Sequence, residues 1–302
     1  MLGCFALILS FALVVVTSRT VDVTTTASVS NAAPTVGTVY LNDSATWSTT
    51  DTYNASNDID LTQGSTKTIY AHALVTDTNG ADDIVNGGLD FYRADKEEDC
   101  SFFAETPAPD KNFCYLAKAG GGVGMGTCTI AAASATTTRL ICPIPLEYFT
   151  DPGEWWARVT VLDAANATGG DSTQTDIAEL LALSFPASLA YDATALGGTS
   201  GEEIYEITQY GNVAADAQVR GGALTCDVGS IPVGNQDWSL EQYDNFVDLT
   251  ASDVYTGLDI AARTNDSVVL SSVLFWKLTV PADGVSGDCT GTTVFTAITP
   301  EV

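Results

Sequence analysis

The sequence predicts an all-β fold: two Ig-like β-sandwich domains, preceded by an N-terminal apolar helix and a Val/Thr-rich strand. Three observations support this prediction. Short runs of alternating apolar and polar residues recur along the chain with turn residues between them, as in sandwiches. The length of 302 residues suits two domains. Hydrophobic residues make up 45% of the chain, which is enough to fill two cores.

The first element is the apolar segment at residues 1–18. Met1–Val16 carries no charge, and Ser10 is its only hydroxyl. One interpretation is a helix that is retained after a charged leader is removed and that packs in the core of a filament. The other is a signal peptide that lacks the usual basic start, because the first Lys or Arg is Arg19. The segment is slightly shorter than the roughly 20 apolar residues that cross a bilayer.

Residues 19–33 are predicted to form a strand and linker. Val and Thr nearly alternate in Thr17–Asn31, a composition typical of strands. We expect these segments to join copies of the chain in a homopolymer by one of two routes. A retained Met1–Val16 would pack as helices in a filament core, whereas after its removal Thr20–Ser30 would be a free strand that completes the sheet of a neighbouring copy. The expected polymerisation residues are Phe5, Leu7, Leu9, Leu13, Val16, Val21 and Val23.

Residues 34–185 are predicted to form the first sandwich, with a cysteine-bearing insertion. The expected strands are Thr35–Leu41, Thr66–Thr76, Gly88–Arg93, Thr127–Ile130, Arg139–Ile144 and Glu154–Leu162. Alternation in the second of these places Ile69 and Val75 on one face, with Ala71 and Ala73 between them. The fourth and fifth strands are expected to pair as a hairpin. Thr175–Phe185 is expected to be a short helix or a final strand.

Residues 186–302 are predicted to form the second sandwich. The expected strands are Glu202–Gln209, Ala215–Arg220, Ala223–Cys226, Asp237–Leu240, Val268–Val280 and Gly291–Ile298. The last two are expected to form a hairpin, because Pro281-Ala-Asp-Gly is a good turn sequence. That hairpin would bring Cys289 close to the strand that holds Cys226.

The cysteines indicate an oxidising compartment. Cys4 lies in the apolar segment, and the six others permit fifteen pairings. No C-x-x-C motif occurs, and the single His72 is far away in sequence, so zinc is disfavoured. Their positions favour the disulfides Cys100–Cys114, Cys128–Cys142 and Cys226–Cys289. We therefore expect an extracellular protein at the cell surface.

Four Asn-x-Ser/Thr triplets fit the same compartment as acceptors of covalent N-glycans. They begin at Asn42, Asn54, Asn166 and Asn265.

Charge limits the partners. Eleven basic and thirty-eight acidic residues give a net charge of −27. Nucleic acid is excluded as a partner, because phosphate binding needs a basic face. Anionic membrane surfaces are disfavoured for the same reason, so contact with a membrane is expected only before assembly.

The sequence offers little for catalysis, and we predict no enzyme. Nucleophilic catalysis needs a base beside Ser or Cys, and the only histidine, His72, lies in the middle of a predicted strand. Gly120–Gly126 precedes a strand rather than a helix, so it does not fit a phosphate-binding loop. Paired carboxylates of a secreted glycan hydrolase stay open as an alternative, because acidic residues are abundant.

Calcium is the best prediction of a bound group, and no other cofactor is expected. The run Asp77-Thr-Asn79-Gly80-Ala-Asp82-Asp83 places oxygen ligands around a glycine turn, as sites for hard cations do. The candidate ligands are Asp77, Asn79, Asp82 and Asp83, with Asp163 at a strand end that is expected to lie nearby. A turn rich in Asp and Asn that binds no metal is the alternative.

Two kinds of role are open to the tryptophans. Trp156 and Trp276 lie in predicted strands and are expected in the cores. Trp47 lies in a polar loop and is the best candidate for an exposed contact with sugar.

Several stretches resemble secreted surface proteins of uncultivated archaea and small-genome bacteria. These stretches are SNAAPTVGTVYLN, VTDTNGADDI, WWARVTVLDAANATG, YGNVAADAQVRGGALTCDVGSIPVGNQDWSL and FWKLTVPADGVSGDCTGTTVFTAI. The resemblance covers most of Ser30–Ile298 and implies a surface location and a structural role. The arrangement is also similar to archaeal type IV pilins and archaellins, and more loosely to TasA-like fibre proteins.

Together these features favour a structural subunit of an extracellular pilus-like filament that polymerises through its N-terminal segment. Its partners are then copies of itself. A surface-layer or adhesin protein that binds glycans or partner cells is the first alternative, and a secreted glycan hydrolase is the second.

Overall fold

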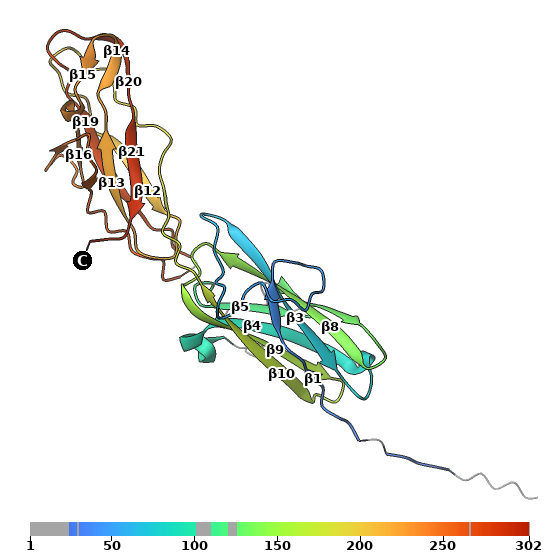
Figure 1. The fold of residues 1–302 in the computed structure, drawn as a ribbon. Coiled ribbons are helices and arrows are strands. Elements are labelled where there is room, and N and C mark those ends of the chain that lie inside the picture. Colours follow the sequence, from blue (N-terminus) through green and yellow to red (C-terminus); the bar gives the residue numbers. More distant parts are fainter. Residues whose placement is uncertain (1–23, 29, 101–109, 120–125, 266, 302) are drawn as a thin grey trace, which may run out of the picture. The chain divides into compact units, whose positions relative to one another are not determined.

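The computed structural model of this chain describes residues 24–28, 30–100, 110–119, 126–265 and 267–301, with only the backbone at 97–99. The chain divides into two units, Met1–Asn31 and Ala32–Val302. Every described strand belongs to the second unit (Figure 1). The all-β prediction is confirmed, while the immunoglobulin-like topology stays a prediction. The predicted apolar helix lies outside the described residues.

Two five-stranded sheets form the first sandwich. One sheet contains β1 (Thr35–Val36), β2 (Tyr40–Asn42), β3 (Thr66–Thr76), β7 (Thr129–Ala132) and β8 (Thr137–Glu147). The other contains β4 (Ile84–Arg93), β5 (Cys114–Lys118), β6 (Gly126–Thr127), β9 (Gly153–Asp163) and β10 (Thr168–Ile177). The strand orders are β1–β3–β8–β7, with β2 also beside β3, and β10–β9–β4–β5–β6. Two short 3-10 helices, η1 (Ala81–Asp83) and η2 (Ala94–Asp99), flank β4.

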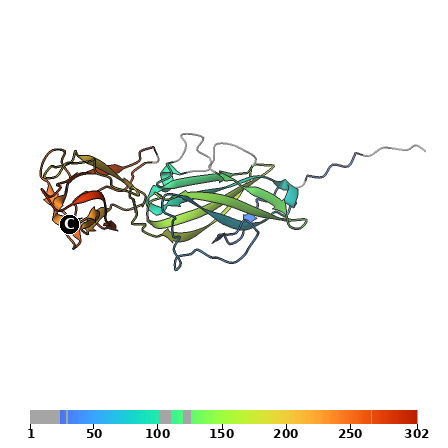
Figure 2. The same cartoon turned by 90° about the horizontal axis from the view of Figure 1, so that it is seen from above.

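The core of the first sandwich lies between these sheets, which face each other in Figure 2. In β3 the predicted apolar face is confirmed, because Ile69 and Val75 are both fully buried.

In β9 the prediction for Trp156 is wrong. Trp155 is the fully buried tryptophan, and Trp156 lies half-buried on the opposite face. Side chains alternate along a strand, so Trp155 shares its face with Val159 and Trp156 does not.

The predicted strand Thr35–Leu41 divides into β1 and β2. Gly37 lies at the break, where its N–H donates to Leu74 O at 2.8 Å. The hairpin between β7 and β8 is present, with Thr129 opposite Ile141. Thr175–Phe185 contains no helix; it holds the end of β10 and the two-residue strand β11 (Leu183–Ser184).

The second sandwich is built from three sheets. The largest contains β11, β12 (Glu203–Gln209), β16 (Gln236–Ser239), β17 (Val247–Asp248) and β19 (Ser271–Leu278). A three-stranded sheet contains β13 (Asp216–Gly221), β18 (Val254–Tyr255) and β21 (Thr293–Ile298). Another contains β14 (Leu224–Val228), β15 (Ser230–Ile231) and β20 (Ser286–Thr290), and the 3-10 helix η3 (Val233–Asn235) precedes β16.

Trp238 and Trp276 fill the core of this sandwich, so the prediction for Trp276 is confirmed. The predicted hairpin between Val268–Val280 and Gly291–Ile298 is wrong. β19 pairs with β12 and β16, whereas β21 pairs with β13 in another sheet. The residues between them form an additional strand, β20, which pairs with β14.

Three disulfides brace the fold. The structure joins Cys100 to Cys114, Cys128 to Cys142 and Cys226 to Cys289, the same pairs that the sequence predicts. Cys289 reaches Cys226 because β20 pairs with β14 in that register. In the chain-entropy account, a 15-residue loop contributes about 3 kcal/mol of stability, and the longer loop closed by Cys226–Cys289 contributes more.

Buried polar side chains connect the two sandwiches within the unit Ala32–Val302. Asn112 Nδ2 donates to Arg263 O at 2.8 Å, and Asn212 Nδ2 donates to Thr150 O at 3.0 Å. The guanidinium of Arg263 lies 3.8 Å from the centre of the Phe149 ring. Because buried hydrogen bonds are costly to break, these contacts stabilise the connection.

No helix within the described part of the chain has the length and apolar character needed to cross a membrane.

Candidate metal centre

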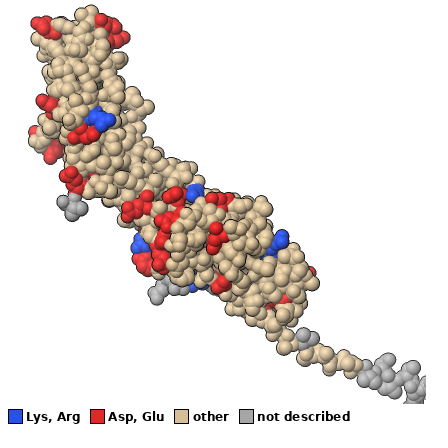
Figure 3. Space-filling view, in the orientation of Figure 1, with Lys and Arg blue, Asp and Glu red and all other residues tan. Residues whose placement is uncertain are grey.

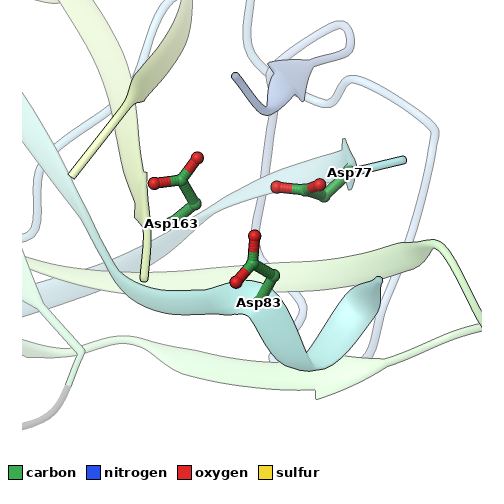
Figure 4. A group of neighbouring side chains, drawn as sticks. All are labelled: Asp77, Asp83 and Asp163. Carbon is green, nitrogen blue, oxygen red and sulfur yellow. The ribbon is translucent and has the colours of Figure 1, made fainter. Parts of the chain in front are cut away.

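Three aspartates meet where β3 and β9 end. Asp77 directly follows β3, Asp83 is the last residue of η1, and Asp163 is the last residue of β9. One carboxylate oxygen from each lies within 4.8 Å of the others. Figure 4 shows the three carboxylates turned toward one another.

Local backbone geometry brings the first two aspartates together. Gly80 has φ of 138°, a value that side-chain-bearing residues rarely adopt, and it turns the chain between Asp77 and Asp83. The N–H of Asp83 then donates to Gly80 O at 3.1 Å. The N–H of Asp77 donates to Thr136 O at 2.9 Å, which ties this turn to the β7–β8 hairpin.

Asp163 comes from the turn between β9 and β10. Its Oδ1 accepts hydrogen bonds from Ala165 N at 2.9 Å and Ala167 N at 2.7 Å. Asn166 adopts the left-handed conformation that this tight turn requires, with φ of 65°. The N–H of Ala164 donates to Asp83 O at 2.9 Å, so the two loops are directly linked.

Asp77 is the most informative residue of the three. Its side chain is 1% exposed, and its Oδ1 accepts a hydrogen bond from Asn79 N at 2.7 Å. Its Oδ2 is buried and has no hydrogen-bond partner among the described residues. A buried carboxylate oxygen without a donor costs free energy, so a cation bound at this oxygen would stabilise the fold.

The arrangement suits a hard cation. Within the described residues, no Lys or Arg forms an ion pair with Asp77 or Asp83. Oxygen ligands of Ca²⁺ lie 2.3–2.6 Å from the ion, so two ligands on opposite sides are about 5 Å apart. Ligands of Mg²⁺ at 2.0–2.1 Å would be at most about 4.2 Å apart. Three carboxylates within 4.8 Å of one another are close enough to contact one Ca²⁺ ion together.

Two predicted ligands lie outside this cluster. Asp82 is exposed, because adjacent residues of the short helix η1 point in different directions. The side-chain oxygen of Asn79 accepts a hydrogen bond from Ala32 N at 2.9 Å. Asp163, which the sequence places at a strand end expected to lie nearby, completes the cluster instead.

The predicted glycosylation sites differ in their surroundings. Asn166 is exposed in its turn, whereas Asn54 and Asn265 are half-buried. Asn42 is 3% exposed, and its Nδ2 donates to Thr50 O at 3.4 Å. The side chain of Asn42 is thus largely enclosed in the folded chain, and glycosylation of the four asparagines stays a prediction.

His72 and Trp47 pack together as structural residues. His72 is fully buried, its Nε2 lies 2.9 Å from Ser44 O, and its Nδ1 accepts from Ser48 N at 3.4 Å. The half-buried Trp47 ring lies 5.8 Å from the His72 ring, and the Arg139 guanidinium lies 5.4 Å from the centre of the Trp47 ring. Trp47 is therefore not a freely exposed platform for sugar.

The remaining predicted site residues lie outside the described part of the chain. These are Phe5, Leu7, Leu9, Leu13, Val16, Val21 and Val23, all within residues 1–23.

No family model matches the chain, and no curated protein matches it. One similar solved structure is a chaperone–tip adhesin complex of CFA/I fimbriae, with 11% identity, coverage of 87% of this chain and 84% of that one, and a TM-score of 0.28. A second is the CupB6 tip adhesin from Pseudomonas aeruginosa, with 8% identity, coverage of 88% and 94%, and a TM-score of 0.26. A third is the C-terminal domain of the AgI/II polypeptide BspA from Streptococcus agalactiae, with 10% identity, coverage of 89% and 97%, and a TM-score of 0.22. Similarities this low carry no argument about fold or function.

Proposed function

We propose that this chain is a structural subunit of an extracellular pilus-like filament and that copies join through the N-terminal segment. The observation that carries the proposal is a groove beside the edge of β21 that pairs with no other described strand. The chain also has a Val/Thr-rich segment whose described residues, Thr24–Ser28, belong to no strand. The three disulfides support an extracytoplasmic location, because disulfides persist in oxidising compartments.

The donor in this proposal is the Val/Thr-rich segment. Its residues Thr24–Ser28 are exposed and belong to no strand. Residues of this composition favour an extended conformation, but a single strand is stable only when a sheet pairs with its backbone. A second copy of the chain offers such a sheet.

The acceptor is the groove in the second sandwich, with a volume of about 1060 Å³. It lies between β20–β21 and the segment Pro186–Leu196. The outer edge of β21 pairs with no other described strand, so its backbone groups are available for strand addition. Leu189 and Phe295 contribute apolar side chains, and the buried Tyr191 hydroxyl has no hydrogen-bond partner among the described residues. A peptide group of an added strand would supply that partner.

A contact between the N-terminal segment of one copy and the groove of the next can repeat along a filament without closing into a ring. The donor precedes the first sandwich and the acceptor belongs to the second, so each copy uses two different surfaces. Such heterologous contacts form a fibre when the rotation between copies does not close a ring. The alternative route, in which residues 1–18 stay attached and pack as helices in the filament core, stays a prediction.

The test compares the full chain with variants that lack residues 1–31 or only residues 1–18. Loss of residues 1–31 is expected to abolish assembly, as measured by sedimentation and electron microscopy. Strand addition predicts that the variant lacking 1–18 still assembles, whereas a helical core predicts that it does not. A full chain that stays a monodisperse monomer at high concentration would count against both routes.

Glycan binding, the first alternative, would require an exposed aromatic surface. Trp47, its predicted anchor, is half-buried and packs beside His72 and Arg139.

A further inference from the structure

We propose that Asp77, Asp83 and Asp163 bind one Ca²⁺ ion, which fastens the end of β3 to the end of β9. The proposal is independent of filament formation. It rests on the approach of the three carboxylates within 4.8 Å and on the buried Asp77 Oδ2, which has no partner among the described residues. The Asp77 carboxylate is turned toward the other two (Figure 4).

The energetic argument starts from burial. Asp77 and Asp163 are 1% and 0% exposed, and an ionised carboxylate taken out of water needs an opposite charge or several hydrogen-bond donors. Among the described residues, the Asp77 carboxylate accepts one hydrogen bond, at Oδ1 from Asn79 N, and that bond closes its own turn. A third carboxylate, Asp83, then brings further negative charge to a protein with a net charge of −27. A divalent cation offsets the repulsion between the carboxylates and is coordinated by Asp77 Oδ2.

The donor set selects the type of cation. All three side chains offer carboxylate oxygens. Ca²⁺ and Mg²⁺ prefer such oxygen ligands, whereas soft metals prefer the sulfur of Cys or Met. The described cysteines are joined in disulfides, and the only histidine in the chain is buried between Ser44 and Ser48. Ca²⁺ accepts flexible coordination by several carboxylates, whereas Mg²⁺ demands near-ideal octahedral geometry and keeps several waters, so this group of three carboxylates favours Ca²⁺.

One competing explanation is a proton shared between two of the carboxyl groups. Both explanations relieve the repulsion, but only a cation site makes the stability of the fold depend on calcium. The two are therefore separated by adding and removing Ca²⁺ at constant pH.

The experiment measures the thermal unfolding midpoint of the full chain at pH 7.5, first in EDTA and then with CaCl₂ up to 10 mM. With a Kd of about 0.1 mM, in the range of extracellular calcium sites, 10 mM Ca²⁺ would raise the midpoint of the full chain by about 4 °C. Isothermal titration with CaCl₂ is expected to give one ion per chain, and MgCl₂ is expected to produce a smaller shift.

Two matched variants locate the site. Asp77→Asn is expected to abolish the response to calcium and, in EDTA, to be at least as stable as the unmodified chain, because the amide removes one of the repelling charges. Asp82→Asn removes an exposed carboxylate in the same turn and is expected to keep the full response. If Asp77→Asn does not fold, the half-exposed Asp83→Asn replaces it in the same comparison.

Three results would overturn the proposal. The first is an unmodified chain whose midpoint does not change up to 10 mM CaCl₂. The second is a calcium response that persists in Asp77→Asn or Asp83→Asn, which would place the bound ion elsewhere. The third is an equal loss of the response in Asp82→Asn, which would show a general effect of surface charge.

Discussion

At the residue scale, the buried His72 makes the stability of the fold depend on pH. Its Nδ1 accepts a hydrogen bond from Ser48 N, and its Nε2–H faces Ser44 O, so the neutral ring satisfies both neighbours. Burial lowers the pKa of His72 below its ordinary value, because the charged ring loses its hydration. Protonation would also place two N–H groups, those of Nδ1 and Ser48, against each other.

We therefore predict that acid destabilises this part of the fold. With the folded-state pKa below the unfolded-state pKa of about 6.5, the unfolded chain binds the proton first as pH falls. The contribution of His72 is complete above pH of about 6.5 and is lost below it, by at most about 1.4 kcal/mol per pH unit. The measurement is the free energy of urea unfolding between pH 7.5 and 5.

His72→Gln is the matched control, because an amide reproduces one donor and one acceptor but does not titrate. Its unfolding free energy is expected to depend less on pH than that of the unmodified chain. Carboxyl groups also titrate in this range, and both proteins share them. Identical pH profiles would show that His72 does not contribute.

At the element scale, the strand β9 shows that two adjacent residues on opposite faces can differ in their contribution to stability. Trp155 is fully buried, stacks on Phe91 with ring centres 4.9 Å apart, and donates from Nε1 to Asp151 O at 2.9 Å. Trp156 packs on the other face beside the Cys100–Cys114 disulfide and donates to Glu154 Oε1. Adjacent tryptophans thus have different surroundings.

We predict that Trp155→Ala lowers the free energy of unfolding by about 3–5 kcal/mol, because it leaves a large cavity in the core. Trp156→Ala is expected to cost about 1 kcal/mol, because its side chain is half-buried. Denaturant unfolding of both variants measures the difference. Equal costs would mean that the face beside the disulfide is as tightly packed as the core.

The strands themselves were more predictable than their partners. Alternation gives the extent of β3 correctly, because that pattern depends on neighbouring residues only. The pairing of Val268–Val280 with Gly291–Ile298 was wrong, although a good turn sequence lies between them. The intervening residues are too many for a short hairpin loop, and they form β20, whose partner β14 lies far away in sequence.

At the scale of the whole molecule, the candidate metal centre was predicted in part. Asp77 and Asp83 were found from one local run of acidic residues. The contribution of Asp163 depends on the pairing of β4 with β9, which places Ile84 opposite Asp163. The sequence suggests that Asp163 lies nearby, because it follows a predicted strand. Which side chains converge depends on how the strands pair in the sheet, and the sequence does not show this pairing.

Charge governs how copies of the whole chain meet. The chain carries 38 acidic and 11 basic residues, and acidic side chains are spread over the face seen in Figure 3. Two approaching copies therefore repel each other. Salt weakens this repulsion, because the screening length falls from about 10 Å at 0.1 M to about 3 Å at 1 M ionic strength.

We predict that filament assembly becomes more favourable as NaCl rises from 0.1 to 1 M. The proposed contact is made by backbone pairing and apolar burial, which salt does not screen, so reduced repulsion lowers the concentration needed for assembly. Sedimentation at graded protein concentrations measures this threshold. EDTA in all samples excludes an effect of calcium, and the variant lacking residues 1–31 shows whether salt merely precipitates the sandwiches. A threshold that rises with salt would instead indicate a contact built from opposite charges and would contradict strand addition into the groove beside β21.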